Sequence, residues 1–281
     1  MRCLRNAVAV SLLALLTQSG WAHEHEEHEL AGAPNEAAAK VKENLAGLSA
    51  DDRQLAESQK YCPVMPEVLL GEMGAPIKTT LDGHAVMVCC KGCAKAAEKN
   101  PQETLNALAK IQDKVAAAAE METNLAALSA EDRHAAVAQG FCPVMTDSAL
   151  GSMGPPVKVD VNGQAVFVCC KGCGKKAQAN PDKTLKTVAE LQEKTAKLQD
   201  IEASFAALAP SDRSAARAQG YCVVMTDNPL GTMGAPVKIE VGDKAVYLCC
   251  AGCRRKALAN PEQTLATVAE LQRKVAAEAS K

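Results

Sequence analysis

The sequence predicts an α+β protein built from three tandem copies of one small module. When the chain is aligned on itself with a shift of 80 residues, its cysteines, glycines and prolines coincide across three copies. Each copy holds two short apolar runs around a two-residue turn, which is typical of a β-hairpin. Stretches with apolar residues every three or four positions join the copies, and this spacing predicts long amphipathic helices.

The amino-terminal segment resembles a secretory leader. Arg2 and Arg5 precede an apolar run that is too short to span a bilayer, and Gly20 and Ala22 follow with the spacing of a cleavage site. We expect a signal peptide at 1–22, a His/Glu-rich lead-in at 23–34, and metal-binding repeats at 35–118, 119–198 and 199–281. The mature protein is therefore expected to be periplasmic or secreted, without membrane insertion after cleavage.

Composition restricts both the core and the classes of partner. The net charge is −2, so binding of nucleic acid by bulk charge is not expected. Aromatic residues make up only 2% of the chain, which leaves each module little material for a core. Small domains of this kind usually add disulfides, a metal or an oligomeric interface. The 13 cysteines are the candidates for that role.

The elements of a repeat follow from local signals. A second helix, besides the long connecting one, is predicted after the N-cap residues Ser49, Ser129 and Ser211. Tight hairpin turns are predicted at Asp82-Gly83, Asn162-Gly163 and Gly242-Asp243. A short helix is expected to begin around Cys93, and a proline at the first turn starts the long helix after Asn100-Pro101 and its equivalents.

Each repeat carries one upstream cysteine and a cluster of three at the turn from strand to helix. Cysteines two or three positions apart around a glycine can direct their sulfurs to one point, and the upstream cysteine can close the shell, as in small thiolate metal sites. Free N–H groups at the helix start, together with Lys91 and Lys171, favour the thiolate form. The candidate ligands are Cys62, Cys89, Cys90, Cys93, Cys142, Cys169, Cys170, Cys173, Cys222, Cys249, Cys250 and Cys253.

These residues resemble a known family. The pattern Y-C-P-V, a hairpin, V-C-C-K-G-C and N-P-x-x-T-L is similar to YHS/TRASH-like heavy-metal-binding domains. The resemblance covers about fifty residues of each repeat, and it implies roles in metal sensing, trafficking or resistance. It matches Cys62, Cys142 and Cys222 to the upstream ligand of the family. Its C-x3-C corresponds to Cys89 with Cys93, Cys169 with Cys173 and Cys249 with Cys253, while the adjacent cysteine of each repeat lies outside the family's ligand set.

Methionine is the other recurring soft donor. Met65, Met145 and Met225 stand three residues after each upstream cysteine and are candidate further ligands. Thiolate with thioether selects Cu(I), whereas an all-thiolate site also suits Zn(II), so both metals are considered, with Cu(I) first. The alternative for the methionines is to fill gaps in an aromatic-poor core. His84 and His134 do not recur and are expected to face solvent.

The mature amino terminus offers a second kind of site. Cleavage after Ala22 would place His25 third behind a free amino group at His23. An amino nitrogen, deprotonated amides and an imidazole can surround Cu(II) in the square plane that this ion prefers. The alternative is a solvated acidic segment that is rich in histidine.

The function expected from these features is extracytoplasmic heavy-metal binding without catalysis, for buffering, delivery or detoxification. The expected partners are metal ions and a metal transporter or metallochaperone. Two alternatives stay open. Cys90 and Cys93 form a C-x-x-C pair at a helix start, as in a thiol–disulfide oxidoreductase. The four cysteines of each repeat could also form two disulfides in a structural spacer.

Overall fold

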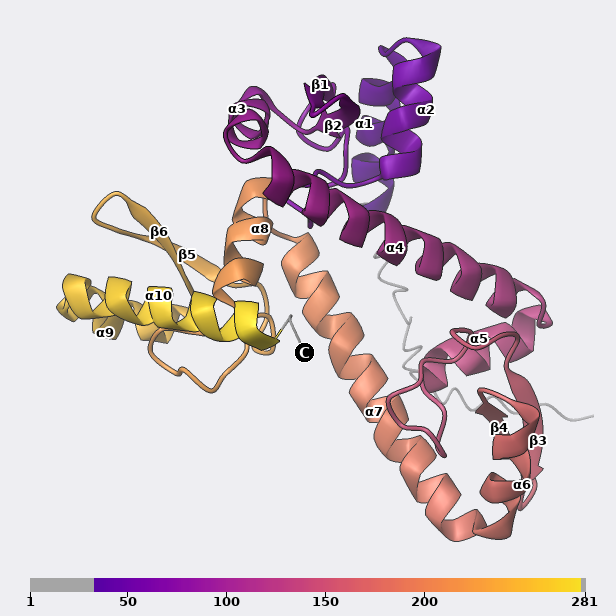
Figure 1. Ribbon diagram of the computed structural model, residues 1–281. Helices are drawn as coiled ribbons and strands as arrows, with labels where there is room; N and C mark the ends of the chain where they lie inside the picture. Colours follow the sequence, from indigo (N-terminus) through magenta and orange to yellow (C-terminus); the bar gives the residue numbers. More distant parts are fainter. Residues whose placement is uncertain (1–32, 279–281) are drawn as a thin grey trace, which may run out of the picture.

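The computed structural model describes residues 33–278 and contains three copies of one α+β unit, which confirms the predicted fold class. In every copy a helical hairpin precedes a two-stranded sheet, a short helix and a long helix (Figure 1). The first copy contains α1 (Ala33–Ala46), α2 (Ala50–Gln59), β1 (Ile77–Leu81), β2 (His84–Val88), α3 (Lys91–Lys99) and α4 (Pro101–Ala126).

The second and third copies repeat this order, except that the third starts its short helix with one 3₁₀ turn. The second contains α5 (Ala130–Gln139), β3 (Val157–Val161), β4 (Gln164–Val168), α6 (Lys171–Ala179) and α7 (Pro181–Ala206). The third contains α8 (Pro210–Gln219), β5 (Val237–Val241), β6 (Lys244–Leu248), η1 (Ala251–Cys253), α9 (Arg254–Ala259) and α10 (Pro261–Glu278).

The sheets are antiparallel hairpins closed by the predicted two-residue turns. In the first, Ile77 pairs with Val88 and Leu81 with His84. Asp82 and Gly83 both have positive φ, 48° and 84°, as a type I′ turn requires. In the third copy only Gly242 of the turn has positive φ, in agreement with the Gly-first order of a type II′ turn. The hairpin expectations are therefore confirmed in all three copies.

The predicted N-cap residues are confirmed in two of the three copies. Ser49 and Ser129 each accept a hydrogen bond, 3.2 Å long, from the backbone N–H three residues later. The prediction for Ser211 is wrong, because Ala209 is the N-cap residue and Pro210 occupies the first helical position. The short helix α3 begins at Lys91 rather than around Cys93, because extended Cys90 serves as its N-cap.

The long helices α4 and α7 each belong to two modules. Near its start, α4 packs Leu105 and Leu108 into the core of the first copy, and near its end it packs Leu125 into the core of the second. In the same way, α7 joins the second core through Val188 and the third through Phe205. The boundaries predicted after residues 118 and 198 therefore fall inside continuous helices.

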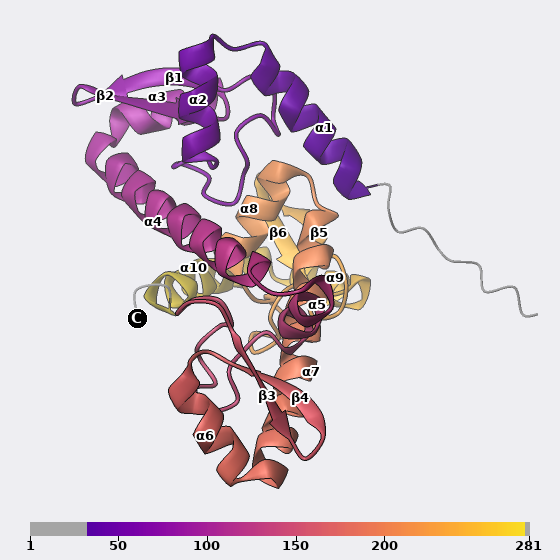
Figure 2. The ribbon, with the colours of Figure 1, turned by 90° about the vertical axis from the view of Figure 1, so that its right-hand side faces the viewer.

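The long helices fold the three modules back on themselves. From the first copy α4 runs to the second, and α7 returns, so that the first and third copies lie next to each other (Figures 1 and 2). Arg213 of α8 reaches Glu72 of the first copy at 2.5 Å, and the two side chains are only 14% and 13% exposed. Within the described residues no helix is both long and apolar enough to cross a membrane.

Candidate metal centre

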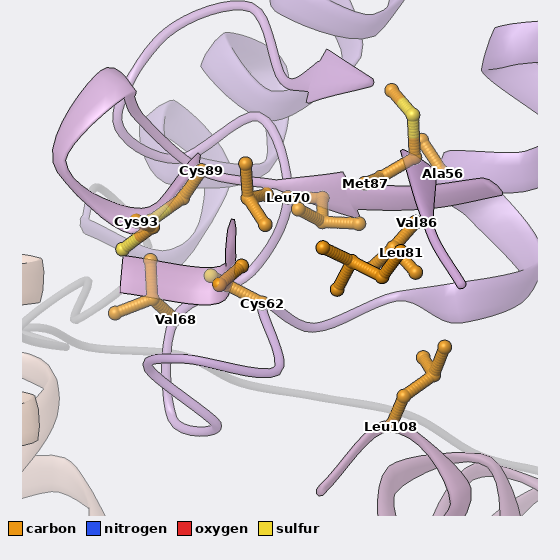
Figure 3. Close-up of a cluster of buried hydrophobic side chains, with 12 residues drawn as sticks. Ala56, Cys62, Val68, Leu70, Leu81, Val86, Met87, Cys89, Cys93 and Leu108 are labelled. Atoms are coloured by element: carbon orange, nitrogen blue, oxygen red, sulfur yellow. The ribbon is translucent and has the colours of Figure 1, made fainter. Parts of the chain in front are cut away.

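Three cysteine sulfurs converge in every module. The Sγ atoms of Cys62, Cys89 and Cys93 all lie within 4.8 Å of one another, and all three residues are buried. Figure 3 shows them in the core of the first module beside Val68. The equivalent triads are Cys142 with Cys169 and Cys173, and Cys222 with Cys249 and Cys253. The C-x3-C sulfurs are 3.5, 3.6 and 3.8 Å apart in the three copies.

The loop after the upstream cysteine stabilises a negative charge on its sulfur. In the first copy the Cys89 thiol donates to Cys62, and the backbone N–H groups of Cys89, Met65 and Val64 add to this effect. Together they outweigh desolvation and lower the pKa of Cys62 to about 6. Backbone bonds hold the loop in shape, because the Cys62 N–H donates to the Val68 carbonyl and the Met65 N–H to the Cys62 carbonyl.

The upstream cysteines of the other copies behave in the same way. Desolvation is the largest single influence on the pKa of Cys142 and of Cys222, and it acts to raise them. Several backbone N–H groups from the following loop and from the end of the second strand outweigh it, so both pKa values are lowered. Stabilisation of a negative charge on the upstream sulfur is therefore common to the three modules.

The two clustered cysteines of each triad stay protonated. The hydrogen bond to the Cys62 thiolate, with burial, raises the pKa of Cys89. Burial, with the charge of Cys62, raises the pKa of Cys93 to about 12. Their equivalents in the other two copies also have raised pKa values, with burial as the largest cause. In each triad the upstream sulfur is thus the one that most readily carries a negative charge, while the two clustered thiols resist losing their protons.

The adjacent cysteine, Cys90 in the first copy, lies beside the triad and is only partly buried. Its sulfur accepts the N–H of Cys93 at 3.5 Å, as the side chain of an N-cap does. This contact is the largest cause of its lowered pKa. In the other copies Cys170 and Cys250 lie 3.7 and 3.9 Å from the sulfur of the last triad cysteine. The structure thus separates the four predicted thiol ligands into a buried triad and one accessible neighbour.

A methionine sulfur stands at the edge of each triad. The Sδ of Met65 is 4.0 Å from Cys89 Sγ, and the distances for Met145 and Met225 are 3.8 and 3.9 Å. These are the three methionines that the sequence singled out. His84 and His134 are exposed, as expected, while His23 and His25 lie outside the described residues.

A buried glutamine, which the sequence analysis missed, connects the helix that precedes each hairpin (α2, α5 or α8) to the second strand of that hairpin. Gln59 is 2% exposed, and its side-chain amide donates to the carbonyls of Tyr61 and Met87 and accepts the Met87 N–H. Gln139 and Gln219 make the same three bonds. We call these three residues the glutamine clamp. In the first module the clamp fixes the chain just before the upstream Cys62 and just before Cys89 of the cysteine cluster. Its only signal in the sequence is recurrence three residues ahead of each upstream cysteine.

None of the twelve cysteines in the described part of the chain forms a disulfide. Comparison with known protein families, with curated proteins and with solved structures finds no match to this chain. The chemistry of the candidate centre is therefore argued from its own geometry.

Proposed function

We propose that the protein binds one soft metal ion in each of its three modules. The observation that carries this proposal is the threefold convergence of buried sulfurs. A thiolate buried without a counter-ion is costly, and a bound cation removes that cost. Because two further thiols lie within 4.8 Å of it, one ion can bond to all three sulfurs with only small side-chain movements.

Cu(I) is the metal that best suits the donor set, and Zn(II) is second. Three thiolates with a thioether about 4 Å from one of them form a soft site, which favours Cu(I). Zn(II) prefers four tetrahedral ligands, and the partly exposed Cys90 is the available fourth thiolate in the first module. In the first module Met65 is therefore the candidate fourth ligand for Cu(I), and Cys90 is the candidate fourth ligand for Zn(II).

The role that we propose is metal buffering, delivery or detoxification outside the cytoplasm, with no catalytic step. Three supports are the leader-like segment at 1–22, the resemblance of each module to YHS/TRASH-like domains, and the tandem arrangement. Three sites on one chain raise the local concentration of ligand and allow an ion to pass between modules. A metal transporter or metallochaperone is the expected partner.

Anaerobic titration of the fully reduced protein with Cu(I), and separately with Zn(II), tests the proposal. We expect saturation at three ions per chain, one for each triad. The triple variant Cys62→Ser, Cys142→Ser, Cys222→Ser removes the upstream sulfur of every triad and should lose this binding. Absence of binding to the reduced wild type, or equal binding by the variant, would contradict the proposal.

One contact favours a second function. Cys170 Sγ is 3.7 Å from Cys173 Sγ at the start of α6, so this C-x-x-C pair can form the disulfide of a thiol–disulfide oxidoreductase. Catalysed reduction of a test disulfide that is lost on Cys170→Ser would support it. The disulfide-stapled spacer is tested by counting free thiols in protein purified without reductant.

A further inference from the structure

One cysteine in each module differs from the other three in its access to solvent. Cys90, Cys170 and Cys250 are partly exposed, whereas the nine triad cysteines are buried. Their sulfurs are still close to the triad, since Cys170 and Cys250 lie 3.7 and 3.9 Å from Cys173 and Cys253. An ion in the triad therefore needs to move only a short distance to bond with the exposed sulfur.

A glycine keeps the outer side of this sulfur uncovered. Apart from the adjacent residues and the helix's own backbone, a Cβ atom built on Gly92 would contact only Cys90 Sγ within 4 Å, at 3.7 Å. The same single contact recurs for Gly172 at 3.8 Å and for Gly252 at 3.7 Å. None of these glycines has positive φ, so the backbone does not require glycine here, and alanine is the better helix former. What glycine provides at this position is open space beside the sulfur.

The short helix that begins at the exposed cysteine is basic in its first two turns. None of the short helices has an acidic residue in its first turn. Each carries exposed basic side chains in its first two turns: Lys91 and Lys95 in the first copy, Lys171, Lys175 and Lys176 in the second, and Arg254, Arg255 and Lys256 in the third. A cationic surface of this kind attracts an anionic partner.

We infer that Cys90, Cys170 and Cys250 are exchange ligands, through which a soft ion passes between the buried triad and an anionic metal–thiolate carrier. The inference rests on the proposed metal binding. As the Cys90 sulfur bonds to the ion, one carrier thiolate leaves and takes up the proton that Cys90 releases. Bonds to the triad sulfurs then replace the remaining carrier bonds. The oxidation state of the metal does not change, so no external oxidant or reductant is needed.

Stopped-flow transfer of Cu(I) from its glutathione complex to the reduced, metal-free protein tests this inference. We expect the triple variant Cys90→Ser, Cys170→Ser, Cys250→Ser to take up copper about tenfold or more slowly, which is a barrier increase of about 1.4 kcal/mol or more. Its final copper content should equal that of the wild type, because the triads are intact. The wild-type rate should fall as ionic strength rises, since salt screens the attraction.

A steric variant separates access from ligation. Gly92→Ala, Gly172→Ala, Gly252→Ala keeps every thiol, and we expect it to slow transfer without lowering copper content or thermal stability. The matched control is Gly47→Ala, where a Cβ meets only a backbone oxygen at 3.9 Å, and its transfer rate should not change.

Wild-type transfer rates in both triple variants would overturn the inference while leaving the proposed function intact. Loss of copper from the serine variant at equilibrium would also overturn it, because the exposed cysteine would then be a permanent ligand. Failure of the wild type itself to take up copper would instead contradict the proposed function.

Discussion

The protonation states of the buried thiols determine how each site responds to pH. The pKa of Cys62 is lowered to about 6, whereas those of Cys89 and Cys93 are raised, the latter to about 12. At pH 8 the first module thus begins with one thiolate and two thiols. Metal binding there should release about two protons rather than three, and calorimetry in buffers of different ionisation enthalpy measures this number.

The same pKa shifts predict that metal affinity falls more steeply with pH below about pH 6 than above it. As pH falls through about 6, Cys62 also becomes protonated, so a third proton competes with the metal. Because the pKa of Cys62 is lowered from its ordinary value of 9.0 to about 6, the loop contributes its full stabilisation to folding above the ordinary value, and this contribution declines as pH falls and is lost below about 6. Three protons released at pH 8, with no change in slope near pH 6, would show that Cys62 is not a preformed thiolate.

The glutamine clamp is the second feature at the scale of single residues. Gln139→Glu keeps the volume of the side chain but removes the amide donor from the carbonyls of Phe141 and Phe167, and it brings a carboxylate into a site that is 2% exposed. Buried polar groups left without partners cost about 1–3 kcal/mol each, so we expect a loss of about 2–4 kcal/mol. Hydrogen exchange of residues 157–170, measured by mass spectrometry, reports this loss within the second module.

The control for this variant is a glutamine that bonds at the surface. Gln178 donates to the carbonyl of Asp160 at 3.1 Å in an exposed position. Gln178→Glu should change protection by less than about 0.5 kcal/mol. Equal effects of the two substitutions would show that the clamp does not stabilise the module.

At the scale of elements, a strained turn ends the helix that precedes each hairpin, which is α2, α5 or α8. Lys60, Gly140 and Gly220 have φ of 67°, 76° and 72°, and in each case the next N–H bonds to the carbonyl of the preceding glutamine. This γ-turn is unfavourable for a residue with a side chain. In the second copy, glycine also lets Thr195 of α7 approach closely, since a Cβ on Gly140 would overlap Thr195 Oγ1. In the first copy the side chain of Lys60 is exposed, so no close approach of another helix accounts for the strained turn.

Opposite substitutions at this turn should have opposite effects. Lys60→Gly relieves backbone strain of about 1–3 kcal/mol and costs about 0.4–1 kcal/mol of chain entropy, so we expect a net gain of about 1 kcal/mol. Gly140→Ala adds both strain and overlap with Thr195, and we expect a loss of about 2–4 kcal/mol. Hydrogen exchange within α2 and α5 measures the two changes.

A glycine in open space provides the control for the overlap. Gly163 has φ of 80°, and nothing lies within 4 Å of its Cβ position, so Gly163→Ala adds strain alone. It should cost less than Gly140→Ala, and the difference measures the contact with α7. Equal costs would show that the close approach of α7 makes no contribution.

The elements and the thiol triads could be predicted from the sequence because their signals are local and repeated. Hairpin turns, helix-starting prolines and cysteine spacing each act over a few residues. The choice between Cys89 and Cys90 rested on the family resemblance alone. The hydrophobic pattern could not make it, because Val86, Met87, Val88 and Cys89 are all buried and no alternation of buried and exposed residues remains. The clamp was missed because a glutamine at the end of a helix usually faces solvent.

At the scale of the whole molecule, the arrangement of the modules depends on contacts that no periodicity reveals. Glu72 and Arg213 are 141 residues apart, and the aligned positions of the other copies carry different partners. Ser152 and Thr232 replace Glu72, while Arg53 bonds to backbone carbonyls at the end of α1. A second pair, Arg217 with Glu67 at 3.3 Å, joins the same two modules. The first and third copies are thus specialised for each other, although they share one fold.

Breaking the first of these ion pairs should open the molecule. Removal of one partner from a largely buried ion pair costs about 3–5 kcal/mol, because the other charge stays desolvated. We therefore expect Arg213→Ala to raise the radius of gyration measured by small-angle X-ray scattering, with the helix content unchanged.

Lys238→Ala is the control, since it removes an ion pair with Asp212 that lies within the third module. The exchanged pair Glu72→Arg with Arg213→Glu should return the scattering toward that of the wild type. Because the triads lie inside single modules, copper content should be the same in all these variants, and a loss of copper on opening would show that the sites depend on the docked arrangement.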